Sequence, residues 1–230
     1  MFYSYYYGGY FIILLPAIIL SLYASIKVNS TFSKYAKVRN SSGLTGYDCA
    51  RRILDMNGLS YIPIERVSGS LTDHYDPGKK VLRLSDSVYD ADTISAISVA
   101  AHECGHAIQH QQEYAPLSMR NAIFPVVNIA SYASWVLILL GIVLSSFSFL
   151  VPFGIVLFAA TVVFQLITLP VEFDASNRAV KILSQTGMVY DGEAKAAKKV
   201  LSAAALTYVA AALSAVLQLL RLVLIFGDNR

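Results

Sequence analysis

Long uncharged runs divide the chain into apolar and polar segments. No charged residue occurs in residues 1–26, 121–171 and 200–220, and most charged side chains fall in 27–120 and 172–199. As a helix, about 20 apolar residues cross a hydrocarbon core of roughly 30 Å. The first and last runs therefore predict one transmembrane helix each, and the middle run is long enough for two.

The middle run contains a predicted turn. Residues 145–148 are rich in serine, and Pro152 and Gly154 follow closely. Small polar residues, proline and glycine favour tight turns, so this run predicts a helical hairpin that turns at the far membrane surface. The N-terminal run has no cationic head and no clear cleavage site before Lys27, which indicates a retained anchor.

Composition and charge support a membrane protein and give it an orientation. With 56% apolar and 14% charged residues, the chain differs from an ordinary soluble domain. The four predicted spans place ten basic residues near the membrane on one side, which the positive-inside rule makes cytoplasmic, with both termini outside. These are Lys27, Lys34, Lys37, Arg39, Arg120, Arg178, Lys181, Lys195, Lys198 and Lys199, against Arg221 and Arg230 on the other side.

We therefore expect a mainly α-helical integral membrane protein with four transmembrane helices and a small cytoplasmic α+β region. The expected segments are a transmembrane anchor (1–26), a cytoplasmic region (27–120), a transmembrane hairpin (121–171), a second cytoplasmic segment (172–199), and a transmembrane helix with the C-terminus (200–230). The net charge of +3, without aromatic residues interleaved among the basic ones, argues against a nucleic-acid partner. Cys49 and Cys104 would lie in a reducing compartment and need no disulfide.

The larger polar block contains recognisable elements. A helix is expected over Tyr47–Met56, followed by a short strand over Ile62–Val67. Residues 71–75 and 81–84, joined by Asp76-Pro77-Gly78, predict a β-hairpin. A further helix is expected from about Ile94 to Gln111, with Asp90 or Asp92 as its N-cap.

That last helix carries the sequence His102-Glu103-Cys104-Gly105-His106. Residues four apart lie on one helix face, so the two histidines can present their imidazoles to one Zn²⁺ ion. Glu103 lies beside them, where a carboxylate can act as general base towards a water molecule. This spacing predicts metal-assisted hydrolysis of a peptide bond.

A catalytic zinc site needs a third protein ligand. His110 lies about 12 Å along the helix axis from His102, which is too far to share the ion. Glu172 is the best candidate, because it is the first charged residue after the predicted hairpin, which would return it to the side of the histidines. Asp174 is the alternative ligand.

Three segments resemble a known family. Residues 71–77, 100–110 and 169–176 are similar to the YugP-type neutral zinc metallopeptidases of bacterial membranes, and the resemblance extends over most of the chain. More distantly, the chain is similar to the HtpX and CAAX prenyl proteases, in which the glutamate of a Glu-x-x-Ala-Asp segment is the third zinc ligand. That likeness implies a gluzincin-like site and favours Glu172 over Asp174. Position 176 is Ser where the distant group has Asp.

Weaker candidates surround this site. His74 on the predicted hairpin could bind substrate, and Arg178 and Tyr190 could stabilise an oxyanion. Cys104 is expected to be a small buried residue. The expected partners are a protein or peptide substrate in or near the membrane, and the lipid bilayer; no pattern indicates an oligomeric state. The alternative is a non-catalytic scaffold or chaperone-like protein with a structural metal, which would not need Glu103.

Overall fold

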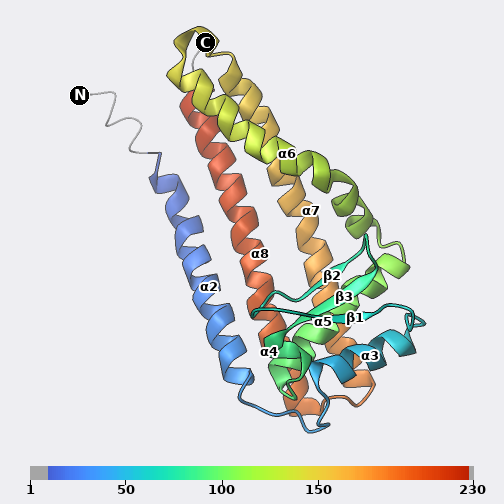
Figure 1. Cartoon of the computed structure of the whole chain (residues 1–230). Helices are drawn as coiled ribbons and strands as arrows, with labels where there is room; N and C mark the ends of the chain where they lie inside the picture. Colours follow the sequence, from blue (N-terminus) through green and yellow to red (C-terminus); the bar gives the residue numbers. More distant parts are fainter. Residues whose placement is uncertain (1–9, 228–230) are drawn as a thin grey trace. The chain divides into compact units, whose positions relative to one another are not determined.

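The computed structural model describes residues 10–227, most of which are helical (Figure 1). Four helical stretches are long and apolar enough to cross a membrane: Ile12–Tyr35, Ala115–Val143, Leu150–Gln185 and Asp191–Phe226. Each contains most of a predicted span, and a small sheet accompanies them, as the sequence predicted. Residues 1–9 of the predicted anchor lie outside the described part of the chain.

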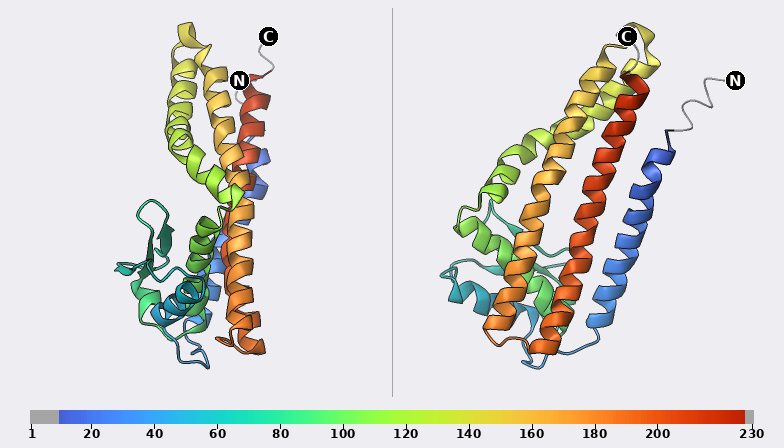
Figure 2. Two further views of the ribbon diagram at one scale, coloured as in Figure 1. Left: turned by 90° about the vertical axis from the view of Figure 1, so that its right-hand side faces the viewer. Right: turned by 180° about the vertical axis from the view of Figure 1, so that it is seen from behind.

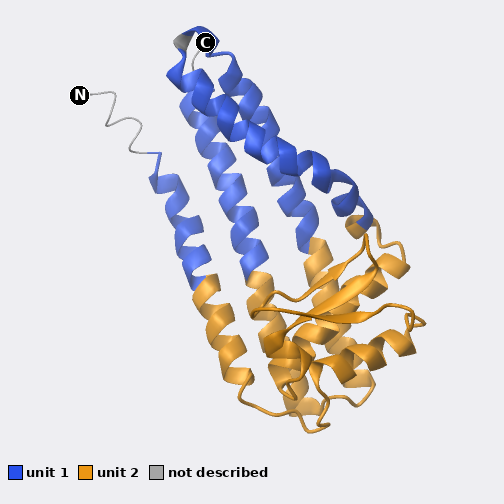
Figure 3. Ribbon diagram, viewed as in Figure 1, with its two compact units in different colours: residues 1–23, 118–169, 207–230 blue, residues 24–117, 170–206 orange. Residues whose placement is uncertain are grey.

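The four stretches comprise η1 (Ile12–Leu14) with α2 (Leu15–Tyr35), then α6 (Ala115–Val143), α7 (Leu150–Gln185) and α8 (Asp191–Phe226). The chain forms two compact units, whose boundaries fall within these helices (Figure 3). Unit 1 comprises Met1–Tyr23, Ser118–Leu169 and Thr207–Arg230. Unit 2 comprises Ala24–Leu117 and Pro170–Leu206.

Unit 1 contains the predicted hairpin. The short helix η2 (Ser145–Phe147) joins α6 to α7, and the two helices form an antiparallel pair that extends from this turn (Figure 2). An apolar cluster formed by Ile138, Phe158, Val162, Ala215 and Leu222 packs the end of α8 against both. Many other large side chains of this unit are exposed, which suits a surface that faces lipid.

Unit 2 contains a three-stranded sheet, formed by β1 (Ile64–Val67), β2 (His74–Asp76) and β3 (Val81–Ser85). The strand order is β1-β3-β2, in which β3 pairs with β1 in parallel and with β2 as an antiparallel hairpin. The predicted hairpin is confirmed, and the predicted strand begins two residues later than expected. Among the described strands, β2 forms one edge of the sheet.

The remaining helices of unit 2 are α3 (Gly46–Met56), α4 (Asp86–Tyr89) and α5 (Ile94–Gln111). Thr45 and Asp48 form a reciprocal capping box at the start of α3. The prediction that Asp90 or Asp92 caps α5 is wrong: Thr93 does so, and its hydroxyl accepts a hydrogen bond from the Ala96 amide at 3.3 Å. Both aspartates bind arginines instead, Asp90 pairing with Arg66 and Asp92 with Arg39.

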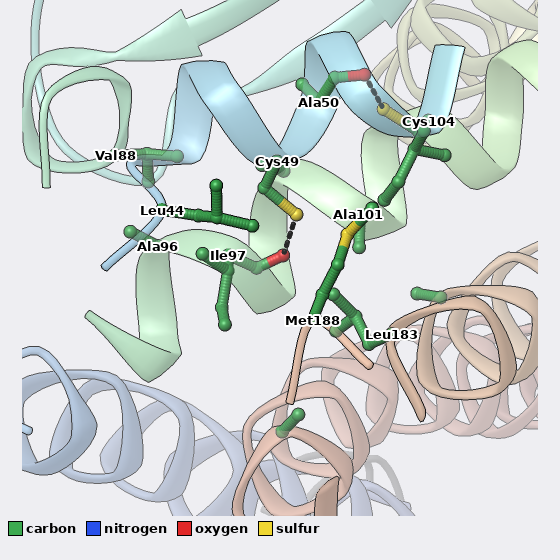
Figure 4. Packing of buried hydrophobic residues seen from close by; sticks show 14 of the residues in the cluster. Leu44, Cys49, Ala50, Val88, Ala96, Ile97, Ala101, Cys104, Leu183 and Met188 are labelled. Carbon is green, nitrogen blue, oxygen red and sulfur yellow. Dashed lines mark hydrogen bonds between the residues drawn. The ribbon is translucent and has the colours of Figure 1, made fainter. Parts of the chain in front are cut away.

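In the core of unit 2, α5 packs against α3 and against the parts of α7 and α8 that belong to this unit. Both cysteines lie in this core, fully buried (Figure 4). The Cys49 thiol donates to the Ile97 carbonyl at 3.7 Å, and the Cys104 thiol donates to the Ala50 carbonyl at 3.6 Å. The two thiols therefore fix α3 against the face of α5 that does not carry the histidines, as expected for Cys104.

Candidate metal centre

The two histidines of α5 lie one helical turn apart in unit 2. Their ring centroids are 4.7 Å apart, and the ring planes are nearly perpendicular, at 85°. Both rings are largely shielded from solvent, and His106 is only 8% exposed. The helix thus presents two imidazoles at one place, as their spacing predicted.

Glu172 on α7 meets both histidines. Its Oε2 atom lies 3.3 Å from His102 Nε2 and 3.6 Å from His106 Nε2, and the residue is 3% exposed. The potential ligand atoms of the three residues all lie within 4.8 Å of one another. Glu172, not the alternative Asp174, therefore joins the histidines in the described structure.

The donor set fits a zinc ion. Two ligand atoms that each lie about 2.0–2.1 Å from a tetrahedral ion are about 3.3 Å apart, close to the separations between Glu172 and the two histidines. Two neutral imidazoles and a carboxylate also match the ligands of many catalytic zinc sites. The three side chains could hold zinc with little rearrangement.

Gln109 orients His106 and links the two helices. The Nδ1 atom of His106 lies 3.0 Å from Gln109 Oε1, an acceptor that favours a proton on Nδ1 and leaves the Nε2 lone pair free for a metal. The Gln109 amide nitrogen donates to the Val171 carbonyl and to Asp174 Oδ2, both at 2.8 Å. One fully buried side chain thus ties His106 to the residue that precedes Glu172.

Ser176 is the corresponding partner of the other histidine. Its hydroxyl oxygen lies 3.2 Å from His102 Nδ1. A neutral hydroxyl therefore orients this imidazole. Each histidine therefore has a polar side chain on the nitrogen that faces away from Glu172.

Gly105 allows α5 to approach α7 closely. A Cβ atom at this position would lie 2.8 Å from the carbonyl oxygen of Ala175 and 3.2 Å from its Cα atom. Both of these are backbone atoms, which cannot move aside as the end of a side chain could. The glycine of the motif is therefore required for the helix contact that brings His102 and His106 to Glu172.

Glu103 occupies a buried position beside the histidines, at 8% exposure. Its Oε2 atom accepts a hydrogen bond from the Tyr75 amide of β2 at 3.0 Å. Burial raises the pKa of Glu103 to about 7, although the neighbouring His102 acts in the opposite direction. The tyrosine hydroxyl lies 2.9 Å from His110 Nδ1, so β2 is attached to α5 at two points.

The three weaker candidates have other partners. His74 is exposed, and its ring contacts the Thr72 carbonyl and the Arg83 guanidinium. Tyr190 is 67% exposed, and its amide donates to Glu193. Arg178 donates to Asp174 and to Gln112. It is linked to His106 indirectly, through Asp174 and Gln109.

Two contributors to the site were not recognised in the sequence. Gln109 lies three residues after His106 on the same helix face, a spacing that brings side chains together. Ser176 lies four residues after Glu172, also on one face. Both could have been found by asking which polar residues share a helix face with a proposed ligand.

Fold and site together describe a membrane-associated protein with two imidazoles and a carboxylate arranged for a metal ion, and the comparison with known families agrees. Residues 10–227 match the family described as "Putative neutral zinc metallopeptidase", and the chain belongs to this family. It is also 56% identical over 216 residues to the "Putative membrane protease YugP" of Bacillus subtilis (strain 168), covering 94% of this chain and 96% of that protein. No solved structure matches the chain. The resemblance of the sequence to the YugP-type neutral zinc metallopeptidases is confirmed.

Proposed function

We propose that the protein is a multi-pass membrane zinc metallopeptidase that hydrolyses peptide bonds of membrane or membrane-proximal proteins. The observation that carries this proposal is the meeting of His102, His106 and Glu172 beside the carboxylate of Glu103. Family membership and the name of the Bacillus subtilis relative support the same conclusion.

In this proposal His102, His106 and Glu172 hold the zinc ion. When bound, zinc supplies a Lewis acid that polarises the scissile carbonyl and makes water a stronger acid. Gln109 and Ser176 fix the orientation of the two imidazoles, so that both Nε2 atoms point towards Glu172 before the ion arrives. The site would therefore need little reorganisation on binding.

Glu103 acts as the general base. Its carboxylate takes a proton from the attacking water and delivers it to the departing amine, while the C–N bond of the substrate breaks. A pKa of about 7, raised by burial, suits both steps, because the group can gain and lose a proton near neutral pH. A purely structural metal site has no use for such a carboxylate.

We further propose that β2 binds the substrate backbone. It is an edge strand, and Tyr75 pairs with Leu82 of β3 while its amide donates to Glu103 rather than to the sheet. An extended peptide could add to this edge by main-chain hydrogen bonds, which would bring its scissile bond next to Glu103. His74 would then contribute to substrate binding from the same strand.

The catalytic region is proposed to face the cytoplasm. The support is the distribution of basic residues, of which ten flank the predicted spans on the side of the motif. A cysteine introduced at the exposed residue Lys37 should then be inaccessible to a membrane-impermeant maleimide in intact cells and accessible after lysis, with Cys49 and Cys104 replaced by alanine. Labelling in intact cells would place the region outside.

The central experiment is Glu103→Gln, which keeps the size of the side chain and removes its basicity. The wild type and the variant are purified, their zinc content is measured, and cleavage of an unstructured protein such as casein is compared. We expect equal zinc and a loss of cleavage of about 10²–10⁴-fold, the usual contribution of a general base. Exposed Glu113→Gln is the matched control and should cleave normally. Unchanged cleavage by Glu103→Gln would show that Glu103 is not the general base, whereas a wild type that holds zinc and does not cleave would support the alternative of a structural metal.

A further inference from the structure

Unit 1 contains a largely apolar cavity that holds one charged side chain. A cavity of about 520 Å³ is lined by residues of α6 and α8 and by Phe11 before η1. Its volume lies within the range of about 300–1,000 Å³ that is usual for small-molecule sites. The lining is almost wholly apolar, with Gln218 and Arg221 as the exceptions.

Arg221 has unused hydrogen-bonding capacity in this cavity. Its guanidinium carbon lies 4.0 Å from the centre of the Phe11 ring, and its Nη1 atom is 3.5 Å from Gln218 Oε1. The Nε atom is buried and has no hydrogen-bond partner among residues 10–227. A buried donor without an acceptor is costly, so the guanidinium is suited to an acceptor that is not part of the described chain.

The depth of Arg221 indicates what that acceptor is. It follows directly after the uncharged run of residues 200–220, which as a helix is about as long as the hydrocarbon core is thick. In a membrane this places the guanidinium at the level of the lipid head groups. Arginine binds phosphate through two parallel N–H donors, and the apolar lining provides a surface for an acyl chain.

We infer that this cavity binds an anionic glycerophospholipid. The phosphate accepts hydrogen bonds from the Arg221 guanidinium, and an acyl chain packs against Trp135, Ile138 and Ile142 of α6. A zwitterionic lipid, whose phosphate is neutralised by its own ammonium group, binds more weakly. Zinc binding and peptide hydrolysis require no such site, so the inference is independent of the proposed function.

The test measures lipid retained by the full chain in detergent. The protein is incubated with equimolar phosphatidylglycerol and phosphatidylcholine of identical acyl chains, desalted, and analysed by mass spectrometry. The wild type should retain mainly phosphatidylglycerol. Arg221→Gln should retain about tenfold less phosphatidylglycerol than the wild type, the factor that corresponds to one charge-assisted hydrogen bond.

A second variant tests the apolar part without touching the charge. Ile142 lines the cavity and is 53% exposed, so Ile142→Trp fills the space without disturbing a packed core and should reduce the retention of both lipids. Its matched control is Ile129→Trp, on the same helix, exposed and outside the cavity. Lys27→Gln controls for the removal of an exposed positive charge. Both controls should retain lipid as the wild type does.

Elution as a single symmetric peak from a sizing column and a helical circular dichroism spectrum equal to that of the wild type show that each variant is folded. If Arg221→Gln does not fold, Ile142→Trp provides the test. The inference is overturned if Arg221→Gln and Ile142→Trp retain as much phosphatidylglycerol as the wild type. It is also overturned if the control variants lose lipid equally, which would indicate a general annulus of lipid. Inorganic phosphate alone, if it stabilised the wild type against heat as strongly as phosphatidylglycerol and only with Arg221 present, would identify a free-anion site instead.

Discussion

The polar side chains of the metal centre and Arg221 both lie in largely apolar surroundings, but they differ in where their hydrogen-bond partners come from. In unit 2, His102 and His106 each have a side-chain partner on Nδ1, and Gln109 is itself held by Val171 and Asp174. In unit 1, the Nε atom of Arg221 has no partner among the described residues. The metal centre is organised by the chain itself, whereas the arginine depends on a molecule from outside.

This difference has energetic consequences. Buried polar groups that satisfy one another form a rigid network, in which the loss of one member disturbs the others. A substitution in the metal centre should therefore affect ligand binding even when it does not touch the ligand. Removal of Arg221 should leave the rest of unit 1 intact and affect only what the cavity binds.

The largest effect is expected for the third ligand. Glu172→Ala should lower zinc affinity by more than about 100-fold, because even outer partners of a metal ligand contribute about 10–100-fold. Competition with a chromogenic chelator measures this. Asp174→Asn should cause a smaller loss, since Asp174 acts through Gln109. An equal or larger loss for Asp174→Asn would reassign the ligand.

Gln109→Ala should come next, with zinc affinity reduced by about 10–100-fold. The substitution leaves Nδ1 of His106 and the Val171 carbonyl without the partner that now joins them. The control is Gln111→Ala, an exposed residue of the same helix whose amide bonds to Asn57. If both variants bound zinc as the wild type does, the organised network would have no energetic role.

Gly105→Ala tests the close contact between α5 and α7. Overpacking against the Ala175 backbone should lower the free energy of unfolding by about 1–3 kcal/mol, seen as a lower Tm, together with weaker zinc binding. Gly192→Ala is the control, because a Cβ at that position meets nothing within 4 Å. It should leave Tm unchanged or slightly raised, as alanine favours helix over glycine.

Ser176 should contribute less than Gln109, because its hydroxyl makes one long hydrogen bond to His102, at 3.2 Å. Ser176→Ala is expected to reduce zinc affinity by about tenfold or less, the lower end of what outer partners contribute. Ser176→Asp supplies a carboxylate, a stronger acceptor for the Nδ1 proton of His102, and should bind zinc at least as tightly as the wild type. A tighter-binding Ser176→Ala would show that the hydroxyl does not orient His102.

The smallest effect concerns the thiols behind the metal centre. Cys49 and Cys104 are fully buried, and burial raises the pKa of Cys49 to about 12 and that of Cys104 well above its usual value. Iodoacetamide at pH 8 should therefore leave both unmodified in the folded protein, because the thiolate is the reactive form. Mass spectrometry before and after unfolding in dodecyl sulfate measures this. Modification of the native protein would mean that the core of unit 2 opens.

The sequence predicted the elements because each left a local signal. Uncharged runs marked the four long helices, and the Asp76-Pro77-Gly78 turn marked the hairpin. The pair His102 and His106 followed from helical spacing, but the choice of Glu172 over Asp174 needed the family resemblance. Contacts between distant segments, such as Gln109 with Val171 and Gly105 with Ala175, depend on how α5 and α7 pack and have no local signature.

The hydrogen bond from the Tyr75 amide to Glu103 has a consequence for the timing of the proposed reaction. If a substrate backbone adds to β2, it competes for that amide, and Glu103 is released as the peptide arrives. Binding of the peptide to β2 and release of Glu103 to act as general base then occur together. Without a bound peptide the Glu103 carboxylate keeps its hydrogen bond to the Tyr75 amide. This would limit unwanted hydrolysis of neighbouring proteins in a crowded membrane.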